Sequence, residues 1–231
     1  MKVVTSFAVL IFFTHILSAQ TSDNAKDMVA GGYLSFNTQH NTIPIPLFNI
    51  AGIPGFLYSS RDSELTDTYF NFTSYVGKEV SPHWLLGIQL VYAMERYKAF
   101  DVETFGQTDT VDLRRNDNQY GLGLFGRFMI NPESKFIAFI QPNLNFSYVS
   151  GRDFRDETET GGQNTYSFSL GASGGVLYEI SDHFRLTSRM GVLGFTAGHW
   201  EDTESDEGNN FTSFGTTLNF SSLSFGFEYK F

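Results

Sequence analysis

The sequence predicts an all-β protein, an antiparallel up-and-down barrel of about eight strands that crosses a membrane. Three observations lead to this prediction. Bulky apolar residues alternate with small or polar residues in several segments. Short and long connections alternate between those segments, and no apolar run of helix length follows Leu17. In lipid every backbone amide must be paired within the protein, so such a chain can span only as a closed barrel.

The first residues have the features of an export signal. Lys2 supplies a positive charge, residues 3–17 are apolar, and the small pair Ser18 and Ala19 follows. Cleavage is expected after Ala19, with the bond after Ser18 as the alternative. About 15 apolar residues are short for the roughly 20 that a membrane helix needs. The predicted division is a signal peptide over 1–19, a short N-terminal segment over 20–27 and a barrel over 28–231.

Composition excludes several classes of protein. The sequence has no Cys, which excludes disulfides, a thiol nucleophile and a thiolate metal site. The formal charge is −10, and it becomes −11 when Lys2 leaves with the signal, so a nucleic-acid partner is not expected. The sequence indicates no cofactor and no metal. With 25 Phe, 11 Tyr and 22 Gly beside only 17% charged residues, the composition favours β-structure.

The alternation is clearest over residues 84–95. One face carries Trp84, Leu86, Ile88, Leu90, Tyr92 and Met94, and the other carries Leu85, Gly87, Gln89, Val91, Ala93 and Glu95. Residues 138–148 and 166–180 repeat the pattern. In a soluble sandwich the outer face carries charge, whereas here the second face carries Gly, Ser and Asn, which suit a narrow lumen. The apolar face would then meet lipid. A soluble barrel of lipocalin type is the structural alternative.

The predicted strands cover 28–38, 67–77, 84–97, 118–130, 136–149, 164–180, 184–196 and 213–231. Their connections are short at 78–83, 131–135 and 181–183. They are long at 39–66, 98–117, 150–163 and 197–212. Tight turns on one side and long loops on the other are typical of outer membrane barrels.

The last predicted strand carries a resemblance to a known family. Its apolar face consists of Leu223, Phe225, Phe227, Tyr229 and Phe231. This pattern resembles the closing strand of OmpA-like and OmpX-like outer membrane β-barrels, which the barrel-assembly machinery reads. The segment 124–128, Leu-Phe-Gly-Arg-Phe, is similar to the Gly-aromatic-Arg-aromatic pattern of outer membrane β-barrel domains. The resemblance covers residues 28–231 and is architectural. It implies an outer membrane location, with membrane lipid and lipopolysaccharide as neighbours, and no periplasmic peptidoglycan-binding domain is expected.

The predicted register places three acids and four bases inside the barrel. They are Glu95, Arg127, Glu179, Arg185, Arg189, Glu228 and Lys230. Charges in a poorly hydrated lumen are stable only when they are paired, so a structural network is the main interpretation. An ion or solute path along the same charges is the alternative. Leu218 and Phe220 break the alternation of the last strand, so a shift of the register by one residue is the alternative there.

The histidines give two smaller expectations. The segment 79–84, Glu-Val-Ser-Pro-His-Trp, is echoed by 179–184, Glu-Ile-Ser-Asp-His-Phe. We interpret both as turns that precede an aromatic residue at the membrane interface, with a metal pair at His83 and His183 as the alternative. His199 and Ser213 are the candidates for an outward-facing lipid hydrolase, but no distinctive local motif surrounds them.

Two connections have unusual chemistry. The last one carries Glu201, Asp202, Glu204, Asp206 and Glu207, which we interpret as a solvated loop, with divalent-cation bridging to lipopolysaccharide as a hypothesis. Residues 41–60 are uncharged and apolar and include Phe48, Phe56 and Tyr58 as a candidate binding loop. This segment could instead pack over the barrel mouth or extend the first two strands.

The sequence therefore predicts a non-enzymatic outer membrane protein. Its expected role is membrane structure, or binding and adhesion through the loops to an extracellular ligand. The second hypothesis is a small pore or a transporter of lipidic ligands, and the third is a lipid-modifying enzyme. Barrel architecture constrains the strands and leaves the loops free to vary, so the strands alone identify no ligand.

Overall fold

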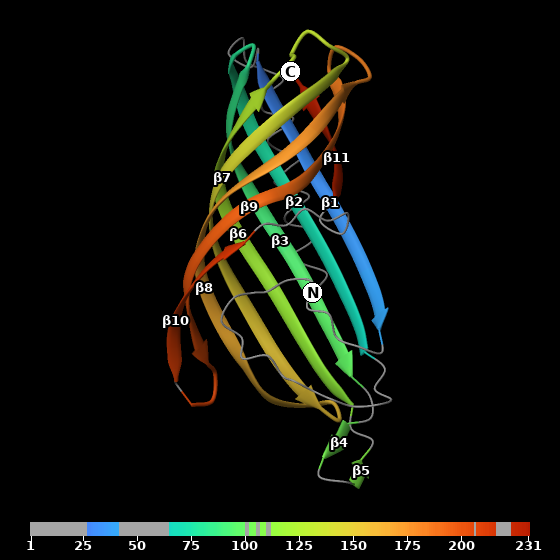
Figure 1. The fold of residues 1–231 in the computed structure, drawn as a ribbon, viewed down its shortest axis with the longest axis vertical. Coiled ribbons are helices and arrows are strands. Elements are labelled where there is room, and N and C mark those ends of the chain that lie inside the picture. The colour runs from blue at the N-terminus through green and yellow to red at the C-terminus, as the bar shows by residue number, and fades with distance from the viewer. Residues whose placement is uncertain are drawn as a thin grey trace.

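The computed structural model describes residues 27–41, 65–99, 102–104, 107–109, 112–205, 207–215 and 223–231. Within them, long tilted strands wrap around a common axis (Figure 1). Eight strands form a closed antiparallel ring in the order β1-β2-β3-β6-β7-β8-β9-β11, and β11 returns to β1. The described part of the chain has no helix long and apolar enough to cross a membrane. The predicted all-β antiparallel barrel of about eight strands is confirmed.

The strands have the following bounds. They are β1 Met28–Asn41, β2 Leu65–Ser81, β3 Trp84–Ala99, β4 Val102–Thr104, β5 Gln107–Asp109, β6 Leu113–Met129, β7 Phe136–Arg155, β8 Thr158–Glu179, β9 Phe184–Asp202, β10 Gly208–Gly215 and β11 Ser224–Lys230. The short strands β4 and β5 pair with each other beyond the outer ends of β3 and β6 (Figure 1). Each of the three predicted short turns separates two strands, although β2 continues to Ser81 and leaves only residues 82 and 83 of the predicted turn at 78–83.

Exposure alternates along the strands as predicted, and the apolar face points outward. On β3, Ile88 and Leu90 are half exposed, at 51% and 50%, while Leu85 and Gln89 are buried. On β6, Leu124 is exposed and its neighbour Phe125 is buried. A water-soluble sandwich would turn these apolar rows into a shared core. Their outward direction fits contact with lipid.

Two rows of aromatic residues border this apolar face. In the outer row, Tyr92, Tyr120, Tyr148 and Tyr166 lie opposite one another on β3, β6, β7 and β8. The inner row, near the short turns, contains Trp84, Phe128, Phe136, Tyr178, Phe184 and Tyr229. Along β3 the rows are eight residues apart, or roughly 26 Å of strand. With a tilt of about 40° this corresponds to a height of roughly 20 Å, somewhat less than the apolar band of about 25 Å in such barrels.

Two of the predicted long loops are wrong, because strands occupy most of their residues. Instead of a loop at 150–163, β7 and β8 continue to a two-residue turn at Asp156 and Glu157. Similarly, β9 and β10 occupy most of 197–212. Beyond the outer tyrosine row the outward face of a strand is no longer restricted to apolar residues. Apolar alternation therefore ends at that row, although backbone pairing continues past it.

The predicted last strand, 213–231, is divided into β10 and β11. Both pair with β9, where Gly215 lies opposite Gly194 and Ser224 lies opposite Arg189. From Gly215 to Ser224 the chain advances nine residues, whereas their partners on β9, Gly194 and Arg189, are only five residues apart. A single continuous strand would advance equally on both sides, so the predicted last strand is not continuous. Leu218 and Phe220, where the predicted alternation fails, lie outside the described residues.

Other predictions also fall outside the described residues. They concern the signal peptide 1–19, residues 20–26, residues 42–60 with Phe48, Phe56 and Tyr58, and Asp206.

Candidate functional site in the barrel lumen

The centre of the lumen is an ion pair between opposite walls. Arg127 Nη1 of β6 lies 2.6 Å from Glu228 Oε2 of β11, and the two side chains are 0% and 1% exposed. These strands are four steps apart in either direction around the ring. The local alternation directs both side chains inward, because their neighbours Phe128 and Phe227 face outward. The pair therefore braces the barrel across its diameter.

Neutral side chains complete the hydrogen bonding of this pair. Arg127 donates from Nη2 to the Tyr33 hydroxyl at 2.7 Å and from Nε to Gln141 Oε1 at 3.0 Å. The Tyr75 hydroxyl donates to Glu228 Oε2 at 2.7 Å. These contacts involve β1, β2, β6, β7 and β11. Buried charges are tolerated where such partners satisfy them, so the arrangement is suited to a permanent structural role.

A second cluster lies closer to the short turns. Arg185 of β9 contacts Glu79 Oε1 at 2.9 Å and Glu179 Oε1 at 2.9 Å, and it reaches Glu228 Oε1 at 3.4 Å. Lys230 also pairs with Glu79. The two clusters share Glu228, and together they match three cations with three carboxylates. We call these six residues with Tyr33, Tyr75 and Gln141 the lumen floor.

Apolar side chains pack around the lumen floor. Met129, Ile137, Phe139 and Leu177 form one buried cluster, and Val29, Tyr33, Tyr75, Leu85 and Phe125 form another. None of these side chains is more than 4% exposed. The ring of Phe139 also lies 4.7 Å from the Arg127 guanidinium. The described residues at this level fill the lumen, as expected of an eight-stranded barrel.

Five of the seven charged residues that the sequence places in the lumen meet in this floor, namely Arg127, Glu179, Arg185, Glu228 and Lys230. Arg189 lies just outward of it and contacts Thr73 and Tyr33. Glu95 lies near the outer end of β3, where Tyr97 donates a hydrogen bond to it. Glu79 is not among the predicted lumen residues, because residues 78–83 were predicted to form a turn. Continuing the inward series of Thr73, Tyr75 and Gly77 by one step would have found it.

The two similar histidine segments form two similar contacts. His83 Nδ1 donates to the Met129 carbonyl at 2.8 Å, and the Met129 amide donates to the His83 carbonyl at 2.8 Å. His183 makes the same pair of bonds with Lys230, at 2.9 and 2.8 Å. Each ring also stacks on an aromatic residue, Phe128 or Tyr229. These histidine clamps tie a turn to the end of the next strand.

The hydrolase candidates do not meet. His199 lies opposite Asn210 and its Nδ1 donates a hydrogen bond to Asn210 Oδ1 at 2.9 Å, whereas Ser213 lies opposite Thr196. The two positions are three residues apart along the strands, or about 10 Å. The described residues also contain no group of three or more acids and histidines placed to hold a metal ion. The described part of the acidic connection thus shows no cation site.

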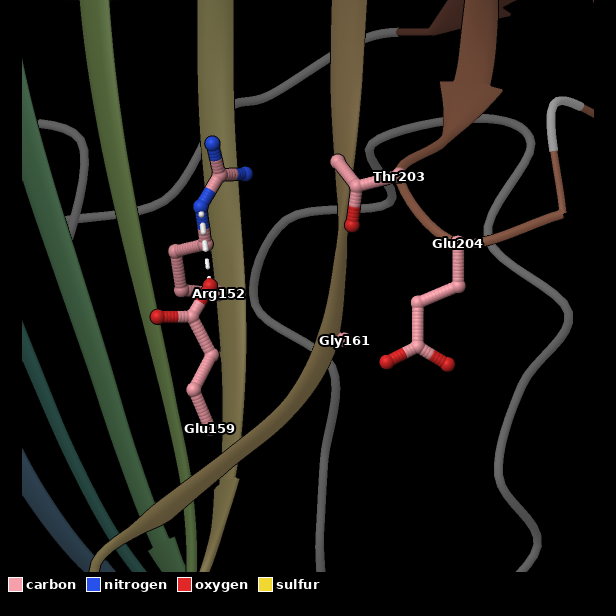
Figure 2. Close-up of a pocket in the computed structure, with 5 residues that line it drawn as sticks. All are labelled: Arg152, Glu159, Gly161, Thr203 and Glu204. Carbon is pink, nitrogen blue, oxygen red and sulfur yellow. Dashed lines mark ion pairs between the residues drawn. The ribbon is translucent and has the colours of Figure 1, made fainter.

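A polar pocket of about 340 Å³ lies between the outer tips of two hairpins. Figure 2 shows Arg152 and Glu159 on one side and Thr203 and Glu204 on the other, with Gly161 between them. Arg152 Nε lies 3.3 Å from Glu159 Oε1. Both the amide and the hydroxyl of Thr203 donate to the Gly162 carbonyl, at 3.0 and 3.1 Å. These bonds fix the β9–β10 turn against β8.

Asp202 organises that turn. Its Oδ1 accepts hydrogen bonds from the amides of Glu204 and Ser205, at 2.8 and 2.9 Å. These amides, first Ser205 and then Glu204, lower the pKa of Asp202 below its usual value. One member of the acidic run therefore has a local structural role.

The comparisons with known proteins concern the fold. No protein-family model and no curated protein matches the sequence. Among solved structures, the chain is similar to the outer membrane protein OprG from Pseudomonas aeruginosa, with 16% identity, coverage of 90% of this chain and 96% of that chain, and a TM-score of 0.42. It is similar to Neisserial surface protein A, with 13% identity, coverage of 88% and 96%, and a TM-score of 0.39. It is also similar to Ail of Yersinia pestis, with 11% identity, coverage of 89% and 99%, and a TM-score of 0.40.

The terminal strand completes the ring. Phe225 and Phe227 of β11 point outward, and Glu228 points into the lumen floor. The same strand pairs with β1 from Val29 to Leu34 on one edge and with β9 on the other. Because the apolar face of this ring points outward and aromatic rows border it at both rims, the chain is an eight-stranded β-barrel of the outer membrane type.

Proposed function

We propose that this protein is a non-enzymatic outer membrane barrel that does not conduct solutes and that presents a rigid extracellular sheet for binding. The observation that carries the proposal is the continuation of paired strands past the outer tyrosine row, above a packed lumen floor. We also expect the protein to contact outer membrane lipid and lipopolysaccharide. The barrel-assembly machinery would recognise its terminal strand.

The β7–β8 hairpin forms one continuous part of this sheet. β7 ends at Arg155, seven residues beyond Tyr148, and β8 begins at Thr158, eight residues before Tyr166. Each arm therefore has roughly 25 Å of strand beyond the tyrosine row. The hydrogen bonds from Thr203 hold the neighbouring turn against β8. A preordered surface loses little conformational entropy when a partner binds, which supports a binding role.

The packed floor argues against the small pore, because a conducting path would have to separate Arg127 from Glu228. The separation of His199 from Ser213 argues against the particular hydrolase pair that the sequence offered. The pocket at the hairpin tips supplies a cation, two carboxylates and a hydroxyl, which can form hydrogen bonds with a polar partner. These observations favour surface binding over transport and catalysis.

Two experiments test the proposal. Purified protein in planar bilayers should give no channel steps, and regular steps would contradict it. In a second experiment, cells displaying the protein are tested for retention on surfaces coated with fibronectin, collagen or purified lipopolysaccharide. A variant in which Asn-Gly replaces residues 152–162, so that Gly151 stays opposite Gln163, should remain heat-modifiable on detergent gels but lose retention. Equal retention by the folded short variant, or no retention by the full protein, would overturn the binding role.

A further inference from the structure

The outer ends of β3, β6 and β7 carry cations on the outward face and carboxylates on the inward face. Directly beyond the outer tyrosine row, the register gives each of these neighbouring strands three outward positions. They are Met94, Arg96, Lys98, Asn118, Asn116, Arg114, Ser150, Arg152 and Phe154. Four of them are cations and none is a carboxylate, although the chain has 25 acids and only 15 Lys and Arg residues. The carboxylates of the same stretches, Glu95, Asp117 and Asp153, lie on the lumen side with Arg115.

We call the four outward cations the basic belt, namely Arg96, Lys98, Arg114 and Arg152. Their contacts follow the outer surface of the sheet. Arg96 Nη1 donates to Asn116 Oδ1 on the next strand at 2.7 Å. Arg152 Nη1 donates at 3.4 Å to Asn164 Oδ1, which also accepts a hydrogen bond from the Tyr148 hydroxyl at 3.1 Å. Lys98 is exposed and forms no ion pair within the part of the chain that the structure describes.

The belt lies at the depth expected for lipid headgroups. On β3, Arg96 is twelve residues from Trp84 of the inner aromatic row, which is roughly 40 Å of strand. With a tilt of about 40° this corresponds to a height of roughly 30 Å, close to the hydrocarbon thickness of a bilayer. Lys98 lies one outward position farther. The polar region of the outer leaflet, which contains the lipid phosphates, therefore begins near Arg96.

The carboxylates that contact the belt leave it open to another anion. Arg114 lies 3.5 Å from Asp112 and 3.6 Å from Glu157, and Arg152 lies 3.3 Å from Glu159. Each of these carboxylates is closer to the outer end of the sheet than the cation that it contacts. Glu157 and Glu159 are also 88% and 56% exposed. Ion pairs this exposed contribute little, so a phosphate on the membrane side can join or replace them.

We propose that the basic belt binds phosphate groups of anionic lipid in the outer leaflet and thereby holds such lipid beside β3, β6 and β7. Guanidinium and ammonium groups donate charge-assisted hydrogen bonds to phosphate. Long Lys and Arg side chains can extend along the sheet to reach headgroups at slightly different heights. Because the cations are spread over three strands, each can contact its own phosphate, and no enclosed cavity is needed. The inference rests on the outer membrane location in the proposed function and not on binding by the hairpin sheet.

The test uses the full barrel, folded in detergent micelles, with purified lipid A as the probe. Lipid A is the phosphorylated anchor of lipopolysaccharide, and a dephosphorylated sample with the same acyl chains is the matched ligand. Native mass spectrometry counts the lipid that remains bound as its concentration is raised. Lipid A should bind saturably, the dephosphorylated form at least tenfold more weakly. Added salt should weaken the binding of lipid A, because it screens exposed charges.

Variants on β3 test the belt without changing the β7–β8 hairpin. Arg96→Gln with Lys98→Gln should raise the apparent Kd for lipid A at least tenfold, since each cation near a charged lipid surface contributes about fivefold in affinity. The matched control removes the same charge elsewhere, with Lys78→Gln at the inner rim and Lys135→Gln in a short turn. This control should leave the Kd unchanged. Heat-modifiability on gels verifies that each variant is folded.

Equal binding of lipid A and its dephosphorylated form, or equal affinity of the β3 variant and the control, would overturn the proposal. Displacement of lipid A by an equal concentration of inorganic phosphate would indicate a site for free anions and overturn the lipid assignment. If the β3 double variant does not fold, the exposed Lys98→Gln alone decides. The β3 variant should match the unaltered protein in retention on fibronectin or collagen, so failure of the surface-binding proposal remains distinguishable.

Discussion

Arg127 and Glu228 join the two strands that lie farthest apart in the ring, with their charged atoms 2.6 Å from each other. Their separation in sequence is 101 residues. Glu228 is carried by β11, the strand that closes the ring between β9 and β1. The central ion pair therefore connects the closing strand to the opposite wall of the barrel.

Replacing one member of this pair should be strongly destabilising. Arg127→Met leaves Glu228 as a buried charge without its main partner, which is expected to cost about 3–5 kcal/mol. Urea unfolding in micelles measures the loss. The double variant Arg127→Met with Glu228→Gln should be more stable than the sum of the two single effects predicts. Arg152→Met, at a partly exposed pair, should change stability by less than about 1 kcal/mol. Equal losses at both arginines would contradict the central role of the floor.

The two histidine clamps should contribute equally and independently. His83→Ala and His183→Ala each remove one side-chain hydrogen bond and one ring stack, so each should reduce the free energy of unfolding by about 1 kcal/mol. The clamps are on separate turns, and the double variant should show additive losses. Unfolding midpoints of the two single variants and the double variant check this. Strong non-additivity would mean that the turns are coupled.

The turn at Asp156 and Glu157 is strained for its residues. Both have positive φ, at 48° and 69°, as a two-residue turn between twisted strands requires. Asn and Gly adopt this conformation more easily, so Asp156→Asn with Glu157→Gly should stabilise the hairpin by roughly 0.4–1 kcal/mol. Amide exchange at Arg155 and Thr158 should slow down. An unchanged or faster exchange would show that the positive φ values carry no strain.

The β9–β10 turn should loosen in acid. Because hydrogen bonds lower the folded-state pKa of Asp202, its stabilising effect is present above the ordinary pKa and is lost as the pH falls through the lowered value. Exchange of the Glu204 and Ser205 amides should therefore accelerate in strongly acidic solution. Asp202→Asn retains an acceptor oxygen without the titration, so its exchange rates should lack that acid-dependent step. The same step in the variant would assign the effect to another group.

The sequence was informative where side chains repeat a simple rule. Period-two alternation predicted the outward rows and the inward direction of Arg127 and Glu228, because the alternation of a strand allows only two faces. It could not predict that these two residues meet, since contacts across a lumen depend on strand tilt and stagger. The inward direction of Arg189 was predictable in the same way, but its contacts with Thr73 and Tyr33 across the lumen were not.

The strand ends were the least predictable part. Beyond Tyr148 and Tyr166 most residues of the hairpin are polar or Gly, and the two apolar ones, Val149 and Phe154, give no period that would mark the strand. Only backbone pairing defines it. Division of the last strand was signalled only by the broken alternation near Leu218. The sequence predicted the function less specifically than the fold. The outward apolar residues and the short turns reflect the membrane environment, and they carry no information about a ligand.

The spacing of the aromatic rows has a consequence for the surrounding lipid. Trp84 and Tyr92 are eight residues apart on β3, whereas Phe136 and Tyr148 are twelve apart on β7. A bilayer of uniform thickness cannot match both walls of an upright barrel. Hydrophobic mismatch of this kind is relieved when the protein leans or when acyl chains compress beside the shorter wall. The protein should therefore impose a thickness gradient on its own annulus of lipid and gather shorter or more disordered chains beside β3 and β6.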